Sequence, residues 1–242
     1  MNTDDLLDLL RNSPKNEGLF NPWWENDPEN DDFSNSYEIR QHQLKAYLDE
    51  RLGKAHILLV GEAMGYQGGH FSGIAMTSER MLLGHMTKKG IKPEDVFISL
   101  LPSRTSKVEV RKDGFNEPTA TIVWEHLLAS GLDPYSFIIW NSLPWHPFNP
   151  EKGMLSNRTP KDSELAAGRK ILKEVIKMIQ PATIIAVGEK AAIQMEELGV
   201  SYKKVRHPAN GGAKLFRQQI SEILHLRAQS LEHRAQSLEH RA

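Results

Sequence analysis

Short runs of apolar residues alternate along this chain with longer stretches in which apolar positions recur every three or four residues. The short runs indicate strands, which we expect at 55–60, 95–101, 136–141, 182–187 and 201–206. The longer stretches indicate helices, which we expect at 77–89, 118–130, 162–179, 188–198 and 213–226. Alternation of strands and helices is typical of a sheet that is parallel or mostly parallel and lies between helical layers. The pattern therefore predicts an α/β fold.

Segments with a different pattern flank this alternating core. The N-terminal segment begins and ends in a predicted helix, and the acidic, irregular arm between the helices contains Trp23 and Trp24, which we expect to anchor the arm on the core. Near the other end, Arg-Ala-Gln-Ser-Leu-Glu-His occurs twice in succession, with an apolar spacing that predicts a helical tail. We therefore divide the chain into an N-terminal segment, a core domain and a repetitive tail, at 1–54, 55–226 and 227–242.

The composition narrows the class of protein. Of the 242 residues, 39% are hydrophobic and 25% are charged, as in soluble globular proteins, and no apolar run approaches the ~20 residues that a membrane span needs. The chain has no cysteine, which excludes disulfides, cysteine nucleophiles and zinc or iron–sulfur sites built on cysteine. The acidic N-terminus lacks the basic and apolar regions of a signal peptide, so we expect a cytoplasmic protein.

The formal net charge of −1 hides an uneven distribution. Residues 1–50 contain 12 acidic and 4 basic side chains, whereas the remaining residues contain 19 acidic and 26 basic side chains. A mildly basic body is compatible with a polyanionic partner such as DNA. A solvated surface without such a partner accounts for the charges equally well.

Two loops combine chemically useful residues with the ends of predicted strands. Gly-Glu-Ala-Met-Gly at 61–65 follows the first core strand, and Arg-His-Pro-Ala-Asn-Gly-Gly at 206–212 follows the last one. Ligands of open α/β sheets bind outside the carboxyl ends of the strands, so we expect the two loops to share one site. The first loop matches neither the dinucleotide-binding fingerprint nor the P-loop, and by itself it is equally compatible with a structural turn.

A third strand adds a candidate for recognising a nucleobase. Asn141 stands at the carboxyl end of the strand predicted at 136–141. Its amide donates and accepts hydrogen bonds side by side, which suits the edge of a planar base. An asparagine that caps a turn before Pro144 is the alternative interpretation.

Taken in order, these segments resemble the uracil-DNA glycosylase superfamily, and most closely its family 4-like branch. The resemblance rests on Gly-Glu-Ala-x-Gly at 61–65, a strand that ends in Asn141, Asn-Arg-Thr-Pro at 157–160 and His-Pro-Ala at 207–209. Val-Gly-Glu-Lys-Ala at 187–191 is similar to the strand-to-helix junction before the last strand of that family. The resemblance implies a three-layer α/β/α fold. It also implies a monofunctional DNA glycosylase, which flips a nucleotide out of DNA and hydrolyses its N-glycosidic bond.

The resemblance gives each candidate residue a role. Glu62 would orient water or stabilise positive charge on the sugar, and His207 would donate a hydrogen bond to the departing base. Asn141 would read the edge of the base, whose pocket would be lined by Gly61, Ala63, Gly65 and Met76. The DNA backbone would be contacted by Ser78, Arg206, Asn210, Gly211 and Gly212. We expect a monomer that needs no cofactor and no metal, and whose partner is DNA with a flipped pyrimidine.

The chain departs from its relatives around the first motif, and it lacks the iron–sulfur cysteines of family 4. Ala63 stands where the best-known branch has an aspartate, and Met76 replaces an aromatic residue that would stack on the base. Gly65 stands where some relatives have a tyrosine that excludes the 5-methyl group of thymine. Together with Gly68 and Gly69, these small or flexible side chains predict room beside C5 of a pyrimidine.

Several functions therefore stay open at the level of sequence. The base is either uracil or a C5-modified pyrimidine, such as the hypermodified cytosine of phage DNA, which would make the protein an anti-phage enzyme. A member of the superfamily that binds DNA without cutting it is the alternative, in keeping with Ala63 and Met76. A small-molecule hydrolase or transferase ranks last, because the chain has no G-x-S-x-G or phosphate-binding motif.

Overall fold

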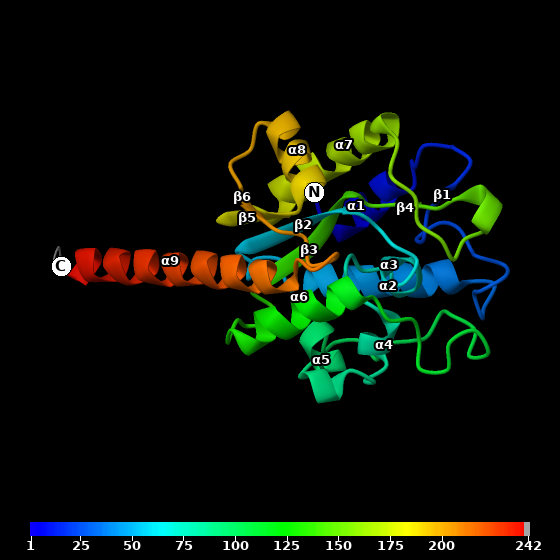
Figure 1. Ribbon diagram of the computed structural model, residues 1–242, viewed down its shortest axis with the longest axis horizontal. Helices are drawn as coiled ribbons and strands as arrows, with labels where there is room; N and C mark the ends of the chain where they lie inside the picture. The colour runs from blue at the N-terminus through cyan, green and yellow to red at the C-terminus, as the bar shows by residue number, and fades with distance from the viewer. Residues whose placement is uncertain (240–242) are drawn as a thin grey trace.

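The computed structural model describes residues 1–239 and has at its centre a parallel four-stranded sheet between layers of helices (Figure 1). The strands are β2 (Ile57–Ala63), β3 (Phe137–Leu143), β5 (Thr183–Val187) and β6 (Lys203–Val205), in the order β3-β2-β5-β6. All three strand pairs are parallel. The predicted α/β class and its three-layer α/β/α architecture are confirmed.

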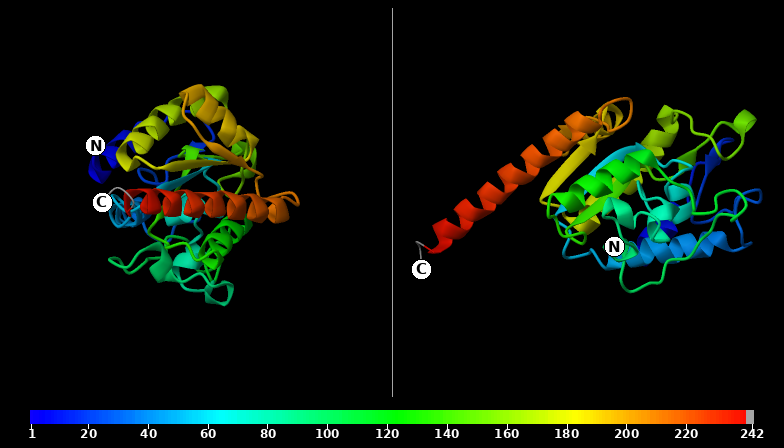
Figure 2. Two further views of the ribbon diagram at one scale, coloured as in Figure 1. Left: turned by 90° about the vertical axis from the view of Figure 1, so that its left-hand side faces the viewer. Right: turned by 60° about the horizontal axis from the view of Figure 1, so that its bottom comes forward.

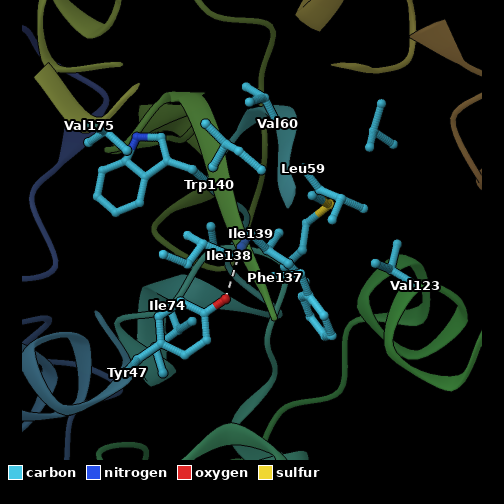
Figure 3. Close-up of a cluster of buried hydrophobic side chains, with 14 of the residues drawn as sticks. Tyr47, Leu59, Val60, Ile74, Val123, Phe137, Ile138, Ile139, Trp140 and Val175 are labelled. Atoms are coloured by element: carbon cyan, nitrogen blue, oxygen red, sulfur yellow. Dashed lines mark hydrogen bonds between the residues drawn. The ribbon is translucent and has the colours of Figure 1, made fainter. Parts of the chain in front are cut away.

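Two groups of helices cover the faces of the sheet (Figures 1 and 2). One face carries α7 (Asp162–Ile179) and α8 (Glu189–Leu198), and the other carries α2 (Ser36–Asp49) and α6 (Pro118–Ala129). Burial on both sides explains why β2 and β3 consist of almost unbroken apolar runs. At the edge of the sheet, the Tyr47 hydroxyl of α2 accepts a hydrogen bond from the Ile139 backbone nitrogen at 2.9 Å, which satisfies part of the free edge of β3 (Figure 3).

The strand predicted at 95–101 is wrong. Pro93 begins a single helical turn, α5 (Pro93–Val96), in which the Asp95 carboxylate accepts a hydrogen bond from the backbone nitrogen of Lys92 at 2.7 Å. The apolar residues that follow have no neighbouring strand, and Ile98 and Leu101 are 71% and 89% exposed. The second half of the predicted strand is therefore an exposed loop, although its residues are of types common in strands.

The helix predicted at 77–89 is also interrupted. Only α4 (Glu79–Leu82) and a 3-10 turn, η1 (Thr87–Lys89), form in this region. Gly84 has a φ of 80° between them, which no continuous helix accommodates. The other short elements are α3 (Gly69–Ser72) and η2 (Pro150–Lys152).

The N-terminal segment packs closely on the core. It contains α1 (Thr3–Leu10) and β1 (Leu19–Phe20), which pairs antiparallel with β4 (His146–Pro147). Trp23 is 1% exposed, stacks on Trp140 with ring centroids 6.3 Å apart and donates a hydrogen bond to the backbone of the core. Trp23 therefore anchors the arm by packing into the core.

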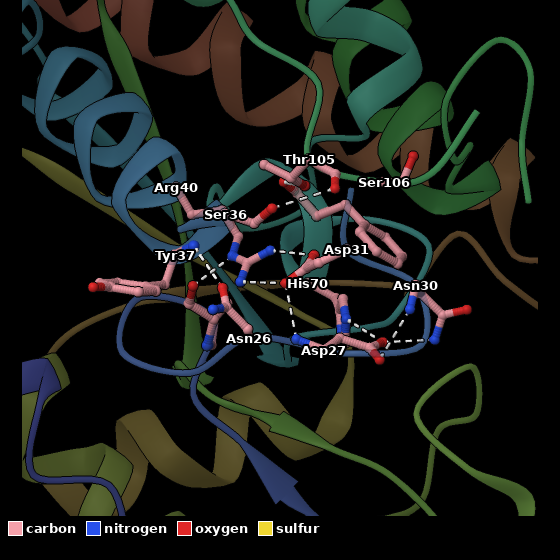
Figure 4. A network of polar contacts seen from close by, with 12 residues as sticks. Asn26, Asp27, Asn30, Asp31, Ser36, Tyr37, Arg40, His70, Thr105 and Ser106 are labelled. Atoms are coloured by element: carbon pink, nitrogen blue, oxygen red, sulfur yellow. Dashed lines mark hydrogen bonds and ion pairs between the residues drawn. The ribbon is translucent and has the colours of Figure 1, made fainter. Parts of the chain in front are cut away.

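Two buried carboxylates of this segment have partners. The guanidinium of Arg40 on α2 donates to both carboxylate oxygens of Asp31 at 2.7 and 3.0 Å (Figure 4). Asp27 lies in the same network, 3.2 Å from the His70 ring nitrogen Nε2 on α3. Because both carboxylates have partners, part of the acidic charge of the arm is compensated inside the protein.

The last helix, α9 (Ala213–Glu239), is continuous from the core domain into the repeated sequence and projects from the body (Figures 1 and 2). The predicted helical tail is thus an extension of the final core helix, without a break at the expected boundary at 227. Residues 240–242 of the predicted tail lie outside the described part. No helix within residues 1–239 is long and apolar enough to cross a membrane.

Candidate active site

A cavity of about 510 Å³ opens beyond the carboxyl ends of β2 and β3. Gly61 on β2 pairs in register with Asn141 on β3, so the first motif and the predicted base reader are neighbours. The loop after β6 closes the cavity from the other side. All residues predicted to act in catalysis or to bind the base line this one cavity: Gly61, Glu62, Ala63, Gly65, Met76, Asn141 and His207.

His207 lies in the cavity wall as a neutral hydrogen-bond donor. Its Nδ1 accepts a hydrogen bond from the backbone nitrogen of Ala209 at 3.2 Å, so the proton of the neutral ring is on Nε2. Burial lowers the pKa of His207, and the nearby carboxylate of Glu62 opposes this only in part. The ring therefore offers an N–H group without a full positive charge at neutral pH.

Two glycines fix the position of His207. A side chain at Gly188, whose φ is 91°, would lie 3.1 Å from the Cβ of His207. At Gly212, a Cβ would lie 2.0 Å from the carbonyl oxygen of His207. The backbone nitrogen of Gly212 donates to the Ala209 carbonyl at 3.1 Å and closes the turn under the histidine.

Glu62 forms an ion pair with Lys190 in the first turn of α8. The Lys190 Nζ lies 2.8 Å from a Glu62 carboxylate oxygen, and the two side chains are 49% and 32% exposed. Such a solvent-accessible pair contributes about 0–1 kcal/mol to stability, so its main effect is to hold the carboxylate in place and to balance its charge. The sequence analysis did not predict a role for Lys190, although the junction at 187–191 contains it.

Asn141 is 2% exposed, and its amide is already engaged with the backbone. In the orientation that satisfies both ends of the amide, the oxygen accepts from the Met64 nitrogen at 3.3 Å and the nitrogen donates to the Trp140 carbonyl at 3.2 Å. Each end retains one further hydrogen-bonding position, because an amide oxygen has two lone pairs and the nitrogen two hydrogens. A Cβ at Gly61 would lie 2.5 Å from the end of this side chain, so only glycine fits beside it.

Met76 forms the floor of the cavity in a strained conformation. Its φ is 43°, a left-handed value that is unfavourable for a long side chain. The Trp124 ring nitrogen donates to its carbonyl at 3.1 Å and holds the backbone there. Its methyl group would be 3.2 Å from a Cβ at Gly61, which places the side chain against the first motif.

The cavity also contains a carboxylate that the sequence analysis missed. Glu117, the residue before α6, lines the cavity together with Pro118 and Thr119. Burial raises the pKa of Glu117 to about 7. Its segment was predicted only as the start of a helix, and no spacing pattern links it to the first motif.

The segment at 157–160 forms a further wall. The side-chain oxygen of Asn157 accepts a hydrogen bond from the Tyr66 nitrogen at 3.1 Å. Arg158 forms a bidentate ion pair with Glu164, with N–O distances of 2.7 and 2.8 Å, and donates to the Gly18 carbonyl at 2.8 Å. The guanidinium therefore supports the loop.

The glycines expected to leave room beside the base differ in what surrounds them. A Cβ at Gly68 would lie 1.9 Å from a carboxylate oxygen of Glu117, and a Cβ at Gly69 would lie 2.6 Å from the methyl group of Met64. These two spaces are filled by other side chains, which contradicts the expectation for both glycines. At Gly65 the nearest atom would be the side-chain nitrogen of Asn157 at 3.6 Å, an ordinary contact distance, so a small side chain would fit at this position in the cavity wall.

A comparison with protein families decides the classification, because residues 50–241 match the uracil DNA glycosylase superfamily. The chain belongs to this superfamily. Its members are DNA glycosylases, hydrolases that act on N-glycosyl bonds in base-excision repair. The match extends over the whole cavity wall, from the first motif to the loop after β6, and the family 4-like branch stays a prediction. No curated protein matches the chain.

The residues predicted to contact DNA differ in whether they are exposed. Arg206, Asn210 and Gly211 are exposed on the loop after β6, where DNA would approach the cavity. Gly212 is buried and its nitrogen already donates within the turn, so its predicted phosphate contact finds no support in this geometry and stays a prediction. The side chain of Ser78 is fully buried at the start of α4, so the same holds for its predicted contact with DNA.

Within residues 1–239 there is no group of three or more histidine, aspartate or glutamate side chains that could hold a metal ion. The chemistry available in the cavity includes a neutral histidine, two carboxylates, a lysine and the amide of Asn141. These groups suit the hydrolysis of a bond whose leaving group departs as an anion.

Proposed function

We propose that the protein is a monofunctional DNA glycosylase that flips a pyrimidine nucleotide and hydrolyses its N-glycosidic bond, leaving an abasic site. The observation that carries the proposal is the tautomer of His207. With Nδ1 occupied by the Ala209 nitrogen, the N–H group at Nε2 is free to face a bound base. Membership of the superfamily provides the reaction class.

In the proposed reaction the flipped base enters the cavity and its edge meets the amide of Asn141. A water oxygen bonds to C1′ of the sugar while the bond from C1′ to the base nitrogen breaks. The electron pair leaves with the base, and the negative charge on its oxygen is stabilised by the His207 N–H group. Glu62 stabilises the positive charge that develops on the sugar. The water proton finally neutralises the departed base.

The base that fits these residues is uracil or a pyrimidine modified at C5. Gly65 supports the modified substrate, because it lines the cavity and Asn157 leaves room beside it for a further carbon atom. Met76 supports it as well, since an unbranched thioether adapts to bases of different shape. Excision of uracil from cellular DNA would make the protein a repair enzyme, whereas excision of modified cytosine from phage DNA would make it a defence enzyme.

A DNA-binding protein without catalysis is the second candidate, and one observation favours it. The carboxylate of Glu62 is paired with Lys190 and has no second carboxylate next to it on β2, where Ala63 follows. Such a protein would hold a flipped base without cutting its glycosidic bond.

The test uses duplexes that each carry one uracil, thymine, hydroxymethylcytosine or glucosylated cytosine, with abasic sites scored by alkaline cleavage. We expect the wild-type chain to excise at least one of these bases, and His207→Ala to excise it about 100- to 1,000-fold more slowly. Glu62→Gln should also slow excision, whereas His85→Gln, which replaces an exposed histidine outside the cavity, should not. DNA binding without excision of any base would refute the glycosylase and favour the binding protein.

A further inference from the structure

The side chain of Glu117 lies in the cavity wall against the backbone of Gly68. Its carboxylate packs against Gly68, so that a Cβ there would lie 1.9 Å from one oxygen and 3.0 Å from the carboxyl carbon. Gly68 is therefore the residue that leaves space for this carboxylate. The two residues are far apart in sequence, and they meet because the turn before α3 faces the N-terminus of α6.

Within residues 1–229, no hydrogen bond or ion pair reaches the carboxylate of Glu117, and burial alone shifts its pKa. Glu117 is half-buried, and a carboxylate without a partner in the wall of a cavity is available to bound water. Since Glu117 borders the cavity, a water molecule there can reach it. The position is thus suited to exchanging a proton with bound water.

Glu62 is in the opposite situation. Its carboxylate is partly exposed and is paired with the ammonium group of Lys190 at 2.8 Å. The ammonium group occupies one oxygen of Glu62, so this carboxylate is less available to a water molecule. Burial raises the pKa of Glu117 to about 7, close to the value that suits a general base at neutral pH.

We propose that Glu117 is the general base that deprotonates the attacking water, an inference that rests on the glycosylase function proposed above. The carboxylate accepts one water proton while the water oxygen bonds to C1′ and the glycosidic bond breaks. The bonding electrons leave with the base, whose oxygen accepts a hydrogen bond from His207. The proton on Glu117 then passes to the base anion, so the products are the free base, the abasic sugar and the regenerated carboxylate.

This assignment gives the reaction a defined pH dependence. The charged or titratable groups that share the cavity with Glu117 are Glu62 of β2, Lys190 of α8, His207 of the last loop and Arg158 of the wall. Glu62 and Arg158 are each ion-paired, to Lys190 and Glu164. A general base acts only when ionised, so the rate of excision should rise with pH through about 7 and then level off.

The experiment measures single-turnover excision of whichever base the wild-type chain removes, as a function of pH. We expect Glu117→Gln to lower the rate by about 100- to 10,000-fold and to abolish the rise near neutral pH. The dissociation constant for DNA should change by less than about threefold, because the substitution keeps the shape of the side chain. Glu125→Gln on the same helix, outside the cavity, is the matched control and should behave as wild type.

A purely structural role for Glu117 would give a different result. Glu117→Ala leaves an empty space where the carboxylate was, and added formate should restore part of its activity if the group acts as a base. A residue that only packs against Gly68 would show no rescue by formate. Rescue also tests the proposal where Glu117→Gln is too unstable to assay, because it needs only the alanine variant.

The outcomes separate this proposal from the proposed function. Excision by the wild-type chain together with an equally fast Glu117→Gln variant, with the same pH profile, would overturn the role of Glu117 and leave the glycosylase function in place. Absence of excision by the wild-type chain from all the modified duplexes would overturn both.

Discussion

The buried pair of histidines beside the cavity makes the stability of the protein sensitive to acid. His146 on β4 is fully buried, and its Nδ1 lies 2.9 Å from Nδ1 of His70. Its Nε2 lies 2.9 Å from the Ser156 carbonyl, which can only accept, so this nitrogen carries the proton. Burial, and after it the charge of His70, lowers the pKa of His146 to about 3. The folded protein therefore excludes a second proton from this ring.

The direction of the effect follows from the two states. An unfolded histidine takes up a proton below its ordinary pKa of about 6.5, whereas folded His146 does so only near its lowered pKa of about 3. The contribution of neutral His146 to the free energy of unfolding is complete above about pH 6.5. It is lost as the pH falls towards 3, by up to ~1.4 kcal/mol per pH unit. Across the full range this amounts to at most ~5 kcal/mol, about half of the stability of a typical domain.

Urea unfolding of wild type and His146→Gln at a series of pH values between about 4.5 and 8 measures this contribution. We expect His146→Gln to be less stable at the upper end by about 1–3 kcal/mol, because the buried partners lose hydrogen bonds. The difference should shrink by up to ~1.4 kcal/mol per pH unit below about pH 6.5. The exposed control His85→Gln should run parallel to wild type. A constant difference between wild type and His146→Gln over the whole range would refute this reasoning.

Three further substitutions test the loops around the cavity. Gly68→Ala should displace the flexible end of Glu117 and lower the rate of single-turnover excision as Glu117→Gln does. Thermal unfolding should show little loss of stability, and Gly68→Ala should not lower the rate further in a chain that already carries Glu117→Gln. Gly212→Ala should cost about 1–3 kcal/mol in urea unfolding, because its Cβ would meet the backbone carbonyl of His207 and the loop has to move. Arg206→Ala should weaken DNA binding similarly for all sequences, and titration against salt should show a slope lower by about 1; unchanged salt dependence would exclude a phosphate contact.

The sequence was sufficient to predict the fold where periodicity coincides with burial. The apolar runs of β2, β3 and β5 are buried between helices, so residues, pattern and environment agree. The run at 95–101 has the same local pattern, but Val96 and Phe97 are buried while Ile98 and Leu101 are exposed, and no strand within residues 1–239 pairs with it. Local pattern contains no information about neighbouring strands. Pro93 was a signal for a helical turn at that point.

The predicted site shows the same limit. The rule that sites form at the carboxyl ends of strands correctly brought Glu62, Asn141 and His207 to one cavity. It did not find Lys190, because an ion pair between residues 128 positions apart leaves no local trace. Nor did it separate Ser78, which is fully buried, from the exposed residues that remain candidates for binding DNA.

The glycines after the first motif illustrate how packing changes the meaning of a sequence feature. A glycine with room beside it widens a pocket, whereas one in close contact with a side chain from elsewhere makes room for that side chain. Gly65 has room for a small group beside Asn157, but the space at Gly68 is taken by the carboxylate of Glu117. The two carboxylates of the cavity then have separate environments: Glu62 is paired with Lys190, whereas burial raises the pKa of Glu117 to about 7. Different environments let similar groups take different roles in catalysis. Gly68, which the sequence suggests as part of a wider substrate pocket, leaves space for the carboxylate of Glu117 instead.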